Sequence, residues 1–408
     1  MNKTRLRKYA RLIARVGANV RRGQCVMITA ELDQPEFIEM LVAECYKAGA
    51  KKVAVEWTHQ PLTALNVKHC KPDVLGNMEK WQLEKWEWQA DELPCKIYIL
   101  SEDPDGLAGI DQRKFAEANA KRSKLIKPIR DRMENKYQWC IAAVPGKKWA
   151  KKVFPTERES VAVNKLWEAI LESSRVYDDP IEEWRLHNES LAKKCEHLNS
   201  LGIKELHYTA KNGTDLRVGM LKEALFCAGG EETLGKKIYF NPNIPTEEVF
   251  TSPDCKRAEG IVYSSMPLSY GGQLIKNFWF RFENGKIVDM GAGENEDMLR
   301  EMIGMDEGAA YLGECALVPY SSPIRKSGIL FYNTLFDENA ACHLAVGRGF
   351  TNVLKDYENY TEKEAHELGI NDSIIHVDFM IGTEDLNIEA ICEDGRIVPI
   401  FKDGEWAE

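Results

Sequence analysis

A histidine and an aspartate interrupt an otherwise apolar segment near the end of the chain. Residues 374–382 read Ile-Ile-His-Val-Asp-Phe-Met-Ile-Gly and follow turn-forming residues, which predicts a buried strand. Because side chains alternate between the two faces of a strand, His376 and Asp378 project from the same face. Burying a carboxylate is costly unless a partner neutralises its charge. A divalent metal is one such partner; the other interpretation is a hydrogen-bonded pair in the core.

Three further segments of the second half set acidic residues or a histidine against apolar sequence. They contain, in chain order, Glu247 and Glu248, then Glu314, then Glu338 and His343. Taken singly, each has a simpler explanation, since a glutamate can be solvated at a strand end and a histidine can be satisfied in the core. Taken together, they have the composition expected of two adjacent divalent metals, because like-charged carboxylates cannot cluster in a dry site without cations. Their spacing along the chain leaves open whether they converge.

The first half of the chain alternates strand and helix patterns. Strands are predicted at residues 25–30, 52–57, 97–100 and 138–144, and helices at residues 35–48, 75–89 and 112–135. This alternation is typical of a mostly parallel sheet with helices on its faces. The Gly-x-Gly-x-x-Gly and P-loop motifs of nucleotide-binding sheets are missing from the sequence, and this half contains no catalytic motif.

Strand patterns dominate from residue 203 onward. Strands are predicted at residues 204–209, 216–218, 260–265, 277–282 and 286–290, and helices at residues 295–305 and 361–367. Asn284-Gly285 and Asp394-Gly395 are hairpin signals. We therefore expect an α/β N-terminal domain with a mostly parallel sheet at residues 1–195. A C-terminal α+β domain rich in mixed or antiparallel strands, residues 196–408, would carry the metal site.

Composition argues against several classes of protein. Lys and Arg total 54 while Asp and Glu total 64, and this net charge of −10 argues against a general binder of nucleic acid or anionic membranes. No signal-peptide core follows the basic N-terminus, and no apolar run is long enough to span a bilayer. The 11 cysteines are scattered without a Cys-x-x-Cys pair, which favours free thiols in a reducing cytoplasm.

Four motifs carry a resemblance that extends over essentially the whole chain. They are Pro245-Thr-Glu-Glu-Val-Phe-Thr251, Gly313-Glu-Cys-Ala-Leu-Val-Pro319, Asp337-Glu-Asn-Ala-Ala-Cys-His343 and His376-Val-Asp378. With these motifs in this order, the sequence resembles the bacterial metallo-aminopeptidases of the aminopeptidase T and aminopeptidase S type. The residues that would hold two divalent cations by this resemblance are Glu248, Glu314, His343, His376 and Asp378. Carboxylates with two histidines allow zinc, cobalt or manganese.

The resemblance implies a two-metal aminopeptidase that releases N-terminal residues, large apolar ones such as leucine, from short peptides. Glu314 would be the bridging carboxylate, and Glu247 or Glu338 would be the catalytic group that carries a proton to the leaving amine. Two alternatives stay open. One is a catalytically weakened or non-enzymatic relative that binds peptides, and the other is a two-metal hydrolase of another amide substrate.

One position departs from the family pattern. The family has an active-site tyrosine seven residues after the histidine of the third motif, where this chain has Phe350. A phenol could donate a hydrogen bond to the developing oxyanion, and losing one such donor costs on the order of 3 kcal/mol of transition-state stabilisation. Three explanations are open: another donor replaces the phenol, the tyrosine is not essential, or activity is weakened.

The resemblance also implies a quaternary structure. Relatives of this type are expected to form a homodimer whose active sites face an internal cavity, which would restrict substrates to short peptides. We expect no nucleic-acid or membrane partner and a cytoplasmic location.

Overall fold

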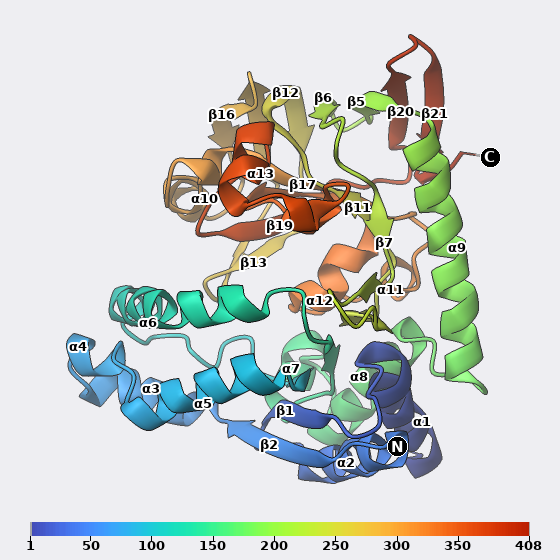
Figure 1. The fold of residues 1–408 in the computed structure, drawn as a ribbon. Helices are drawn as coiled ribbons and strands as arrows, with labels where there is room; N and C mark the ends of the chain where they lie inside the picture. Colours follow the sequence, from blue (N-terminus) through green and yellow to red (C-terminus); the bar gives the residue numbers. More distant parts are fainter. Residues whose placement is uncertain (1, 408) are drawn as a thin grey trace. The chain divides into compact units, whose positions relative to one another are not determined.

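The computed structural model describes residues 2–407, and the chain forms two compact units (Figure 1). The first contains the residues up to Arg185 together with Gly230–Pro245, and the second contains Leu186–Gly229 and the residues from Thr246 onward. The division at Arg185 falls within helix α9 (Pro180–Ser200), which also contains the expected boundary at residue 195. No sequence pattern predicted the return of Gly230–Pro245 to the first unit.

A five-stranded sheet with the order β10-β4-β3-β1-β2 forms the centre of the first unit. Its strands are β1 (Cys25–Glu31), β2 (Lys52–Thr58), β3 (Cys95–Leu100), β4 (Trp139–Ala143) and β10 (Asn243–Ile244). Every adjacent pair is parallel, which confirms the fold class expected for this half. Ile28 on β1 pairs with Ile97 on β3, and both are fully buried, so this face of the sheet forms part of the core.

Helices connect the strands of the first unit. They are α1 (Lys3–Leu12), α2 (Pro35–Ala48), α3 (Gln60–His69), α4 (Pro72–Leu75), α5 (Lys80–Glu92), α6 (Gln112–Met133), α7 (Lys147–Val153) and α8 (Glu159–Ser173), with a π-helical turn at Ile13–Gly17. α2 has Pro35 in its first turn and ends at Gly49, whose φ of 107° favours glycine. A short ribbon, β8 (Glu231–Glu232) and β9 (Tyr239–Phe240), precedes β10.

The second unit contains an eight-stranded antiparallel sheet with the order β16-β15-β12-β6-β5-β20-β21-β22. Its strands are β5 (Ile203–Thr209), β6 (Asp215–Met220), β12 (Pro253–Tyr263), β15 (Trp279–Glu283), β16 (Lys286–Gly291), β20 (Asn387–Cys392), β21 (Ile397–Lys402) and β22 (Glu405–Trp406). The predicted hairpin signals join β15 to β16 and β20 to β21.

A second antiparallel sheet of this unit has five strands in the order β19-β18-β17-β11-β7. Its strands are β7 (Cys227–Ala228), β11 (Val249–Thr251), β17 (Leu312–Leu317), β18 (His343–Gly347) and β19 (His376–Met380). Phe280 on β15 and Phe379 on β19 meet edge to face with ring centroids 5.2 Å apart, and both are buried. The apolar core of the unit therefore lies between its two sheets. The antiparallel strands confirm the fold class expected for the second half.

Short elements complete the second unit. The remaining strands form a hairpin, β13 (Leu268–Tyr270) and β14 (Gln273–Ile275), and the helices are α10 (Glu296–Ile303), α11 (Pro323–Lys326), α12 (Thr334–Asp337) and α13 (Glu362–Leu368). Single 3-10 turns lie at Gly308–Ala310, Glu338–Ala340, Thr351–Val353 and Tyr357–Asn359. Across residues 2–407, no helix combines the length and the apolar character needed to cross a bilayer.

Candidate metal centre

Neighbouring strands of the five-stranded sheet bring acidic and imidazole side chains together. His376 and Asp378 lie on β19, His343 begins β18, Glu314 lies on β17, and Glu248 directly precedes β11. These are the residues expected from the sequence to hold metal. The strands are adjacent in the sheet although they are far apart in the chain.

The register of the sheet puts these side chains on one face. Ala345 on β18 pairs with Asp378 on one side and with Glu314 on the other. His343 lies two residues before Ala345 and therefore points to the same side. His376 has the same relation to Asp378. The small side chain of Ala345 leaves space between the longer polar ones, so four ligating side chains can converge over this part of the sheet.

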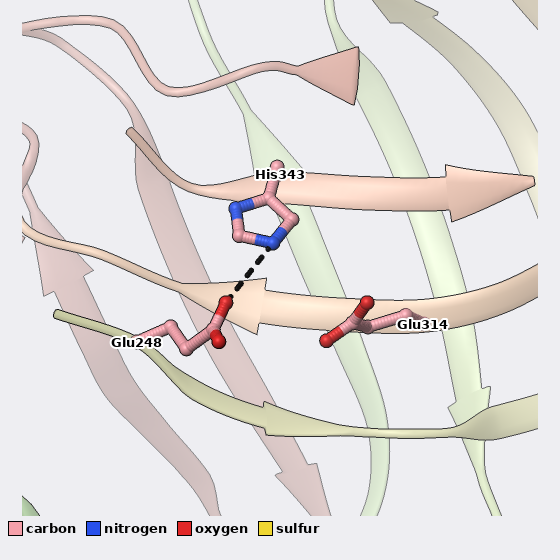
Figure 2. Close-up of side chains that lie close together, drawn as sticks. All are labelled: Glu248, Glu314 and His343. Carbon is pink, nitrogen blue, oxygen red and sulfur yellow. Dashed lines mark ion pairs between the residues drawn. The ribbon is translucent and has the colours of Figure 1, made fainter. Parts of the chain in front are cut away.

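The side chains form two overlapping groups. Figure 2 shows the first, in which Nε2 of His343 lies 3.3 Å from Oε2 of Glu248, with Glu314 beside them. In the second, Nε2 of His376 lies 3.1 Å from Oε2 of Glu314 and 3.2 Å from Oδ1 of Asp378. Within each group, one ligand atom per residue lies within 4.8 Å of the others. Glu314 is common to both groups.

Main-chain carbonyls fix the orientation of both histidines. Nδ1 of His343 lies 3.2 Å from the oxygen of Ala341, and Nδ1 of His376 lies 2.6 Å from the oxygen of Arg348. A carbonyl oxygen only accepts hydrogen bonds, so Nδ1 carries the hydrogen in each ring. In the neutral imidazole, Nε2 then carries the lone pair that a metal ion could bind, and in the protonated ring Nε2 donates to the carboxylate instead. Metal-binding histidines are held in this way.

Buried carboxylates make the site favourable for positive charge. Burial raises the pKa of Glu314 to about 7, although the contact with His376 opposes the rise. Burial alone would lower the pKa of His343, but the hydrogen bond and charge of Glu248 outweigh it and raise the pKa to about 10. The pKa of His376 also rises, because its contacts with Asp378 and Glu314 outweigh burial. Protons or metal cations can supply the charge that the site favours.

The donor set and one unpartnered atom fit a metal ion. Oδ1 of Asp378 is buried and has no hydrogen-bond partner within the described residues, although Nε2 of His376 approaches it. A buried carboxylate oxygen without a partner is costly, and a cation would compensate it. Carboxylate oxygens and imidazole nitrogens suit zinc, cobalt or manganese.

Glu338 lies close to the ligand carboxylates but outside both groups. It begins the turn Glu338–Ala340, which follows α12. Burial raises its pKa well above the ordinary value, and the charges of Glu248 and Asp378 add to the rise. Glu338 is therefore within electrostatic reach of both groups, as expected for the third motif.

Asn339 connects two parts of the site and was missed by the sequence analysis. It is fully buried, and its Oδ1 accepts a hydrogen bond of 2.7 Å from the main-chain nitrogen of Glu247. Its Nδ2 donates to Oε1 of Glu338 at 3.3 Å and to the main-chain oxygen of Leu335 at 3.0 Å. One amide therefore links the segment before β11 to the turn that carries Glu338. Its place between Glu338 and His343 was the signal available in the sequence.

Phe350 lies beside the site. Its ring centroid is 4.8 Å from that of His376 and 5.7 Å from that of Phe250. Its main-chain nitrogen donates to Oγ of Ser252 at 2.8 Å, which helps to fix the loop after β18. The position expected to carry the family tyrosine thus contacts a candidate metal ligand, and its side chain has no hydroxyl.

Comparisons with known proteins extend over the whole chain. Residues 2–406 match the family model described as thermophilic metalloprotease (M29). Aminopeptidase AmpS of Bacillus subtilis is 40% identical over 99% of this chain and 98% of its own length, and aminopeptidase T of Thermus thermophilus is 37% identical over 99% and 98%. The structure of wild-type AmpT from Thermus thermophilus covers 100% of both chains with a TM-score of 0.91 and 36% identity.

Proposed function

The chain belongs to the thermophilic metalloprotease (M29) family, and on that premise we propose that it is an aminopeptidase that uses two divalent cations. Its substrates would be short peptides with a free N-terminus, and the residue released would be large and apolar, such as leucine. The metallo-aminopeptidase class follows from the family and the named relatives. The number of metals, their identity and the side-chain preference are parts of the proposal.

One observation carries the two-metal proposal, namely that Glu314 is common to both groups of potential ligands. A carboxylate has two oxygens and can therefore bridge two cations. The first cation would be held with Glu248 and His343, and the second with His376 and Asp378. Zinc, cobalt and manganese all suit these donors.

Bound divalent cations would polarise the scissile carbonyl and make water a nucleophile at neutral pH. The residues of the chain would hold the reacting groups in place and transfer the proton. The sheet holds the two imidazoles and three carboxylates on one face, so substrate would meet an ordered set of groups. Glu338, which neither group requires, is the side chain that we assign to carry a proton to the leaving amine. Glu247 is the alternative carrier, with its main chain fixed by Asn339.

Substrate profiling tests the aminopeptidase proposal directly. The metal-loaded protein should release leucine from leucyl peptides and should leave the same peptides intact when their N-terminus is acetylated. This result would separate an exopeptidase from a two-metal hydrolase of other amides. Cleavage of the acetylated peptides at a comparable rate would contradict the proposal.

Phe350 supports a second candidate, a catalytically weakened relative that binds peptides. The five candidate ligands are all present and their atoms are grouped, which favours an active enzyme. Turnover of any peptide in a broad panel would exclude the non-enzymatic relative. Peptide binding without turnover by the metal-loaded protein would support it.

We also propose that the protein forms a homodimer and is located in the cytoplasm. None of the 11 cysteines, all of which lie within the described residues, forms a disulfide, and seven of them are buried, as expected for a protein in a reducing compartment. Sedimentation equilibrium of the metal-loaded protein would test the dimer, since a single species of 46.4 kDa would contradict it.

A further inference from the structure

The first unit contains a cavity of about 400 Å³ that the proposed peptidase chemistry does not use. Strands β1, β2 and β3 form its floor, and helices α5 and α6 contribute its walls. Two register pairs lie side by side on the floor, Met27 with Lys96 and Thr29 with Tyr98. Residues two apart in a strand share a face, so the two pairs point into the same space.

Lys96 is a buried cation at the floor of this cavity. Only 5% of its surface is exposed, and its Nζ lies 4.9 Å from the ring centroid of Trp86 and 4.7 Å from that of Tyr137. In the part of the chain that the structure describes, Nζ has no hydrogen bond and no ion pair. Aromatic faces compensate only part of the desolvation of an ammonium group. Burial lowers the pKa of Lys96 to about 8, so the group remains mostly charged at neutral pH.

Gln89 is a second buried polar side chain that lines the cavity. It lies on α5 and is 4% exposed, and no described residue forms a hydrogen bond with its carboxamide. Buried amides are almost always satisfied by protein, water or ligand. Lys96 and Gln89 together therefore offer an ammonium group and an amide donor to whatever occupies the cavity.

The remaining lining combines positive charge with apolar walls. Lys85 lines the cavity and pairs with Glu56 at 2.5 Å, and Arg122 donates to the main-chain oxygen of Leu75 at 2.8 Å. Three cations and one anion line the space, which leaves it positive. Indole rings and methionine side chains of the lining suit an apolar group, and they belong to Trp81, Trp86, Met27 and Met78.

We propose that this cavity binds a small organic carboxylate that carries an aromatic or branched apolar group. The carboxylate would lie against Lys96 and accept a hydrogen bond from Gln89, and the apolar group would pack against the tryptophan and methionine walls. Free amino acids and amine-free carboxylates share this chemistry. The site is independent of the metal centre, since none of the candidate metal ligands lines it.

Calorimetric titration of the full-length protein with 3-phenylpropanoate, L-phenylalanine and 3-phenylpropanamide tests the proposal. We expect 3-phenylpropanoate to bind and 3-phenylpropanamide, which lacks the carboxylate and has no α-amine for the metal centre, not to bind. If L-phenylalanine binds as tightly as 3-phenylpropanoate, free amino acids are the class of ligand that the cavity takes. If it binds more weakly, amine-free carboxylates are that class. No binding of either carboxylate at millimolar concentration, or binding of inorganic phosphate alone, would overturn the proposal.

Variants locate the binding in this cavity. Lys96→Met should weaken the affinity for 3-phenylpropanoate at least about tenfold, because it removes a charged partner. Lys80→Met, the same substitution at an exposed position of α5, should leave it unchanged. Glu314→Gln should also retain binding. Loss of binding in Glu314→Gln together with retained binding in Lys96→Met would assign the ligand to the metal centre and overturn the proposal.

A second measurement tests the proposal independently of Lys96→Met. Gln89→Leu should also weaken binding, and 3-phenylpropanoate should change the tryptophan emission of the unmodified protein. Trp86→Phe should remove most of that change because Trp86 contacts Lys96. An emission change that persists undiminished in Trp86→Phe, with unaltered affinity in Gln89→Leu, would contradict the assignment.

Discussion

Nε2 of His376 lies 3.1 Å from Oε2 of Glu314, while Nδ1 of the same ring lies 2.6 Å from the main-chain oxygen of Arg348. The imidazole is therefore held from behind by a carbonyl and faces a carboxylate that is common to both groups of ligands. This relationship makes Glu314 the residue on which the two-metal proposal depends most.

Glu314→Gln should remove the shared ligand with almost no change of volume. Because outer-sphere partners of metal ligands are worth about 10- to 100-fold, loss of a bridging ligand should lower kcat by more than about 100-fold. Metal content measured by mass spectrometry should fall below two per chain. Glu389→Gln, on an exposed position of β20, is the matched control and should change neither quantity. A Glu314→Gln protein with two metals and full activity would contradict the bridging role.

Asn339→Ala should affect both stability and catalysis. It leaves the buried main-chain nitrogen of Glu247 without its acceptor, which should lower the free energy of unfolding by about 2 kcal/mol. It also frees the carboxylate of Glu338, so kcat should fall on the order of 10- to 100-fold with a smaller change in KM. Denaturant unfolding and steady-state kinetics measure the two effects. Asn66→Ala, at an exposed position of α3, is the control. An unchanged kcat would leave Asn339 a purely structural role.

Phe350→Tyr should introduce the hydroxyl that the resemblance leads us to expect at this position. The ring already lies against His376, so the phenol would be added beside the metal centre. One oxyanion donor is worth on the order of 100-fold in kcat, and we expect a rise of at least about tenfold with little change in KM. Kinetics with a leucyl peptide measure the effect. If kcat stays within twofold of the unmodified protein, another group already supplies the donor.

Lys96→Met should stabilise the chain in a pH-dependent manner. Burial lowers the pKa of Lys96 to about 8 from the ordinary 10.5, so the unfolded chain binds this proton more tightly than the folded one. The free energy of unfolding therefore falls as pH decreases from 10.5 to about 8, by a total of about 3 kcal/mol. At pH 7 the free energy of unfolding of the variant should exceed that of the unmodified protein by this amount, and the difference should shrink towards pH 10.5. Equilibrium unfolding at several pH values checks this, and a difference that does not vary with pH would contradict it.

Local sequence patterns predicted much of the fold, but tertiary contacts decided other parts. The four longer parallel strands and helix α2 follow from apolar runs and from Pro35 and Gly49. The helix predicted at residues 75–89 is instead α4 and α5, separated where Glu79 and Gln82 form a capping box. The two-residue strand β10 has no local signal, because only its pairing with β4 makes it a strand.

The sequence predicted the candidate metal ligands of the site but not the residues that hold them in place. Carboxylates and histidines set in apolar sequence are unusual, and the structure brings Glu248 and His343 to 3.3 Å of each other. Asn339 is a common polar residue whose role depends on contacts with Glu247 and Glu338, which only the folded chain creates. Supporting residues of this kind leave no periodic pattern in the sequence.

The most direct test of the central claim is reconstitution of the metal-stripped protein with cobalt, zinc or manganese, beside His376→Ala. Hydrolysis of a leucyl peptide and the number of bound metals are measured at each step of the titration. We expect activity to return as two metals bind per chain, and we expect His376→Ala to bind fewer metals and to remain inactive. Full activity of the stripped protein without added metal, or of His376→Ala, would contradict the account.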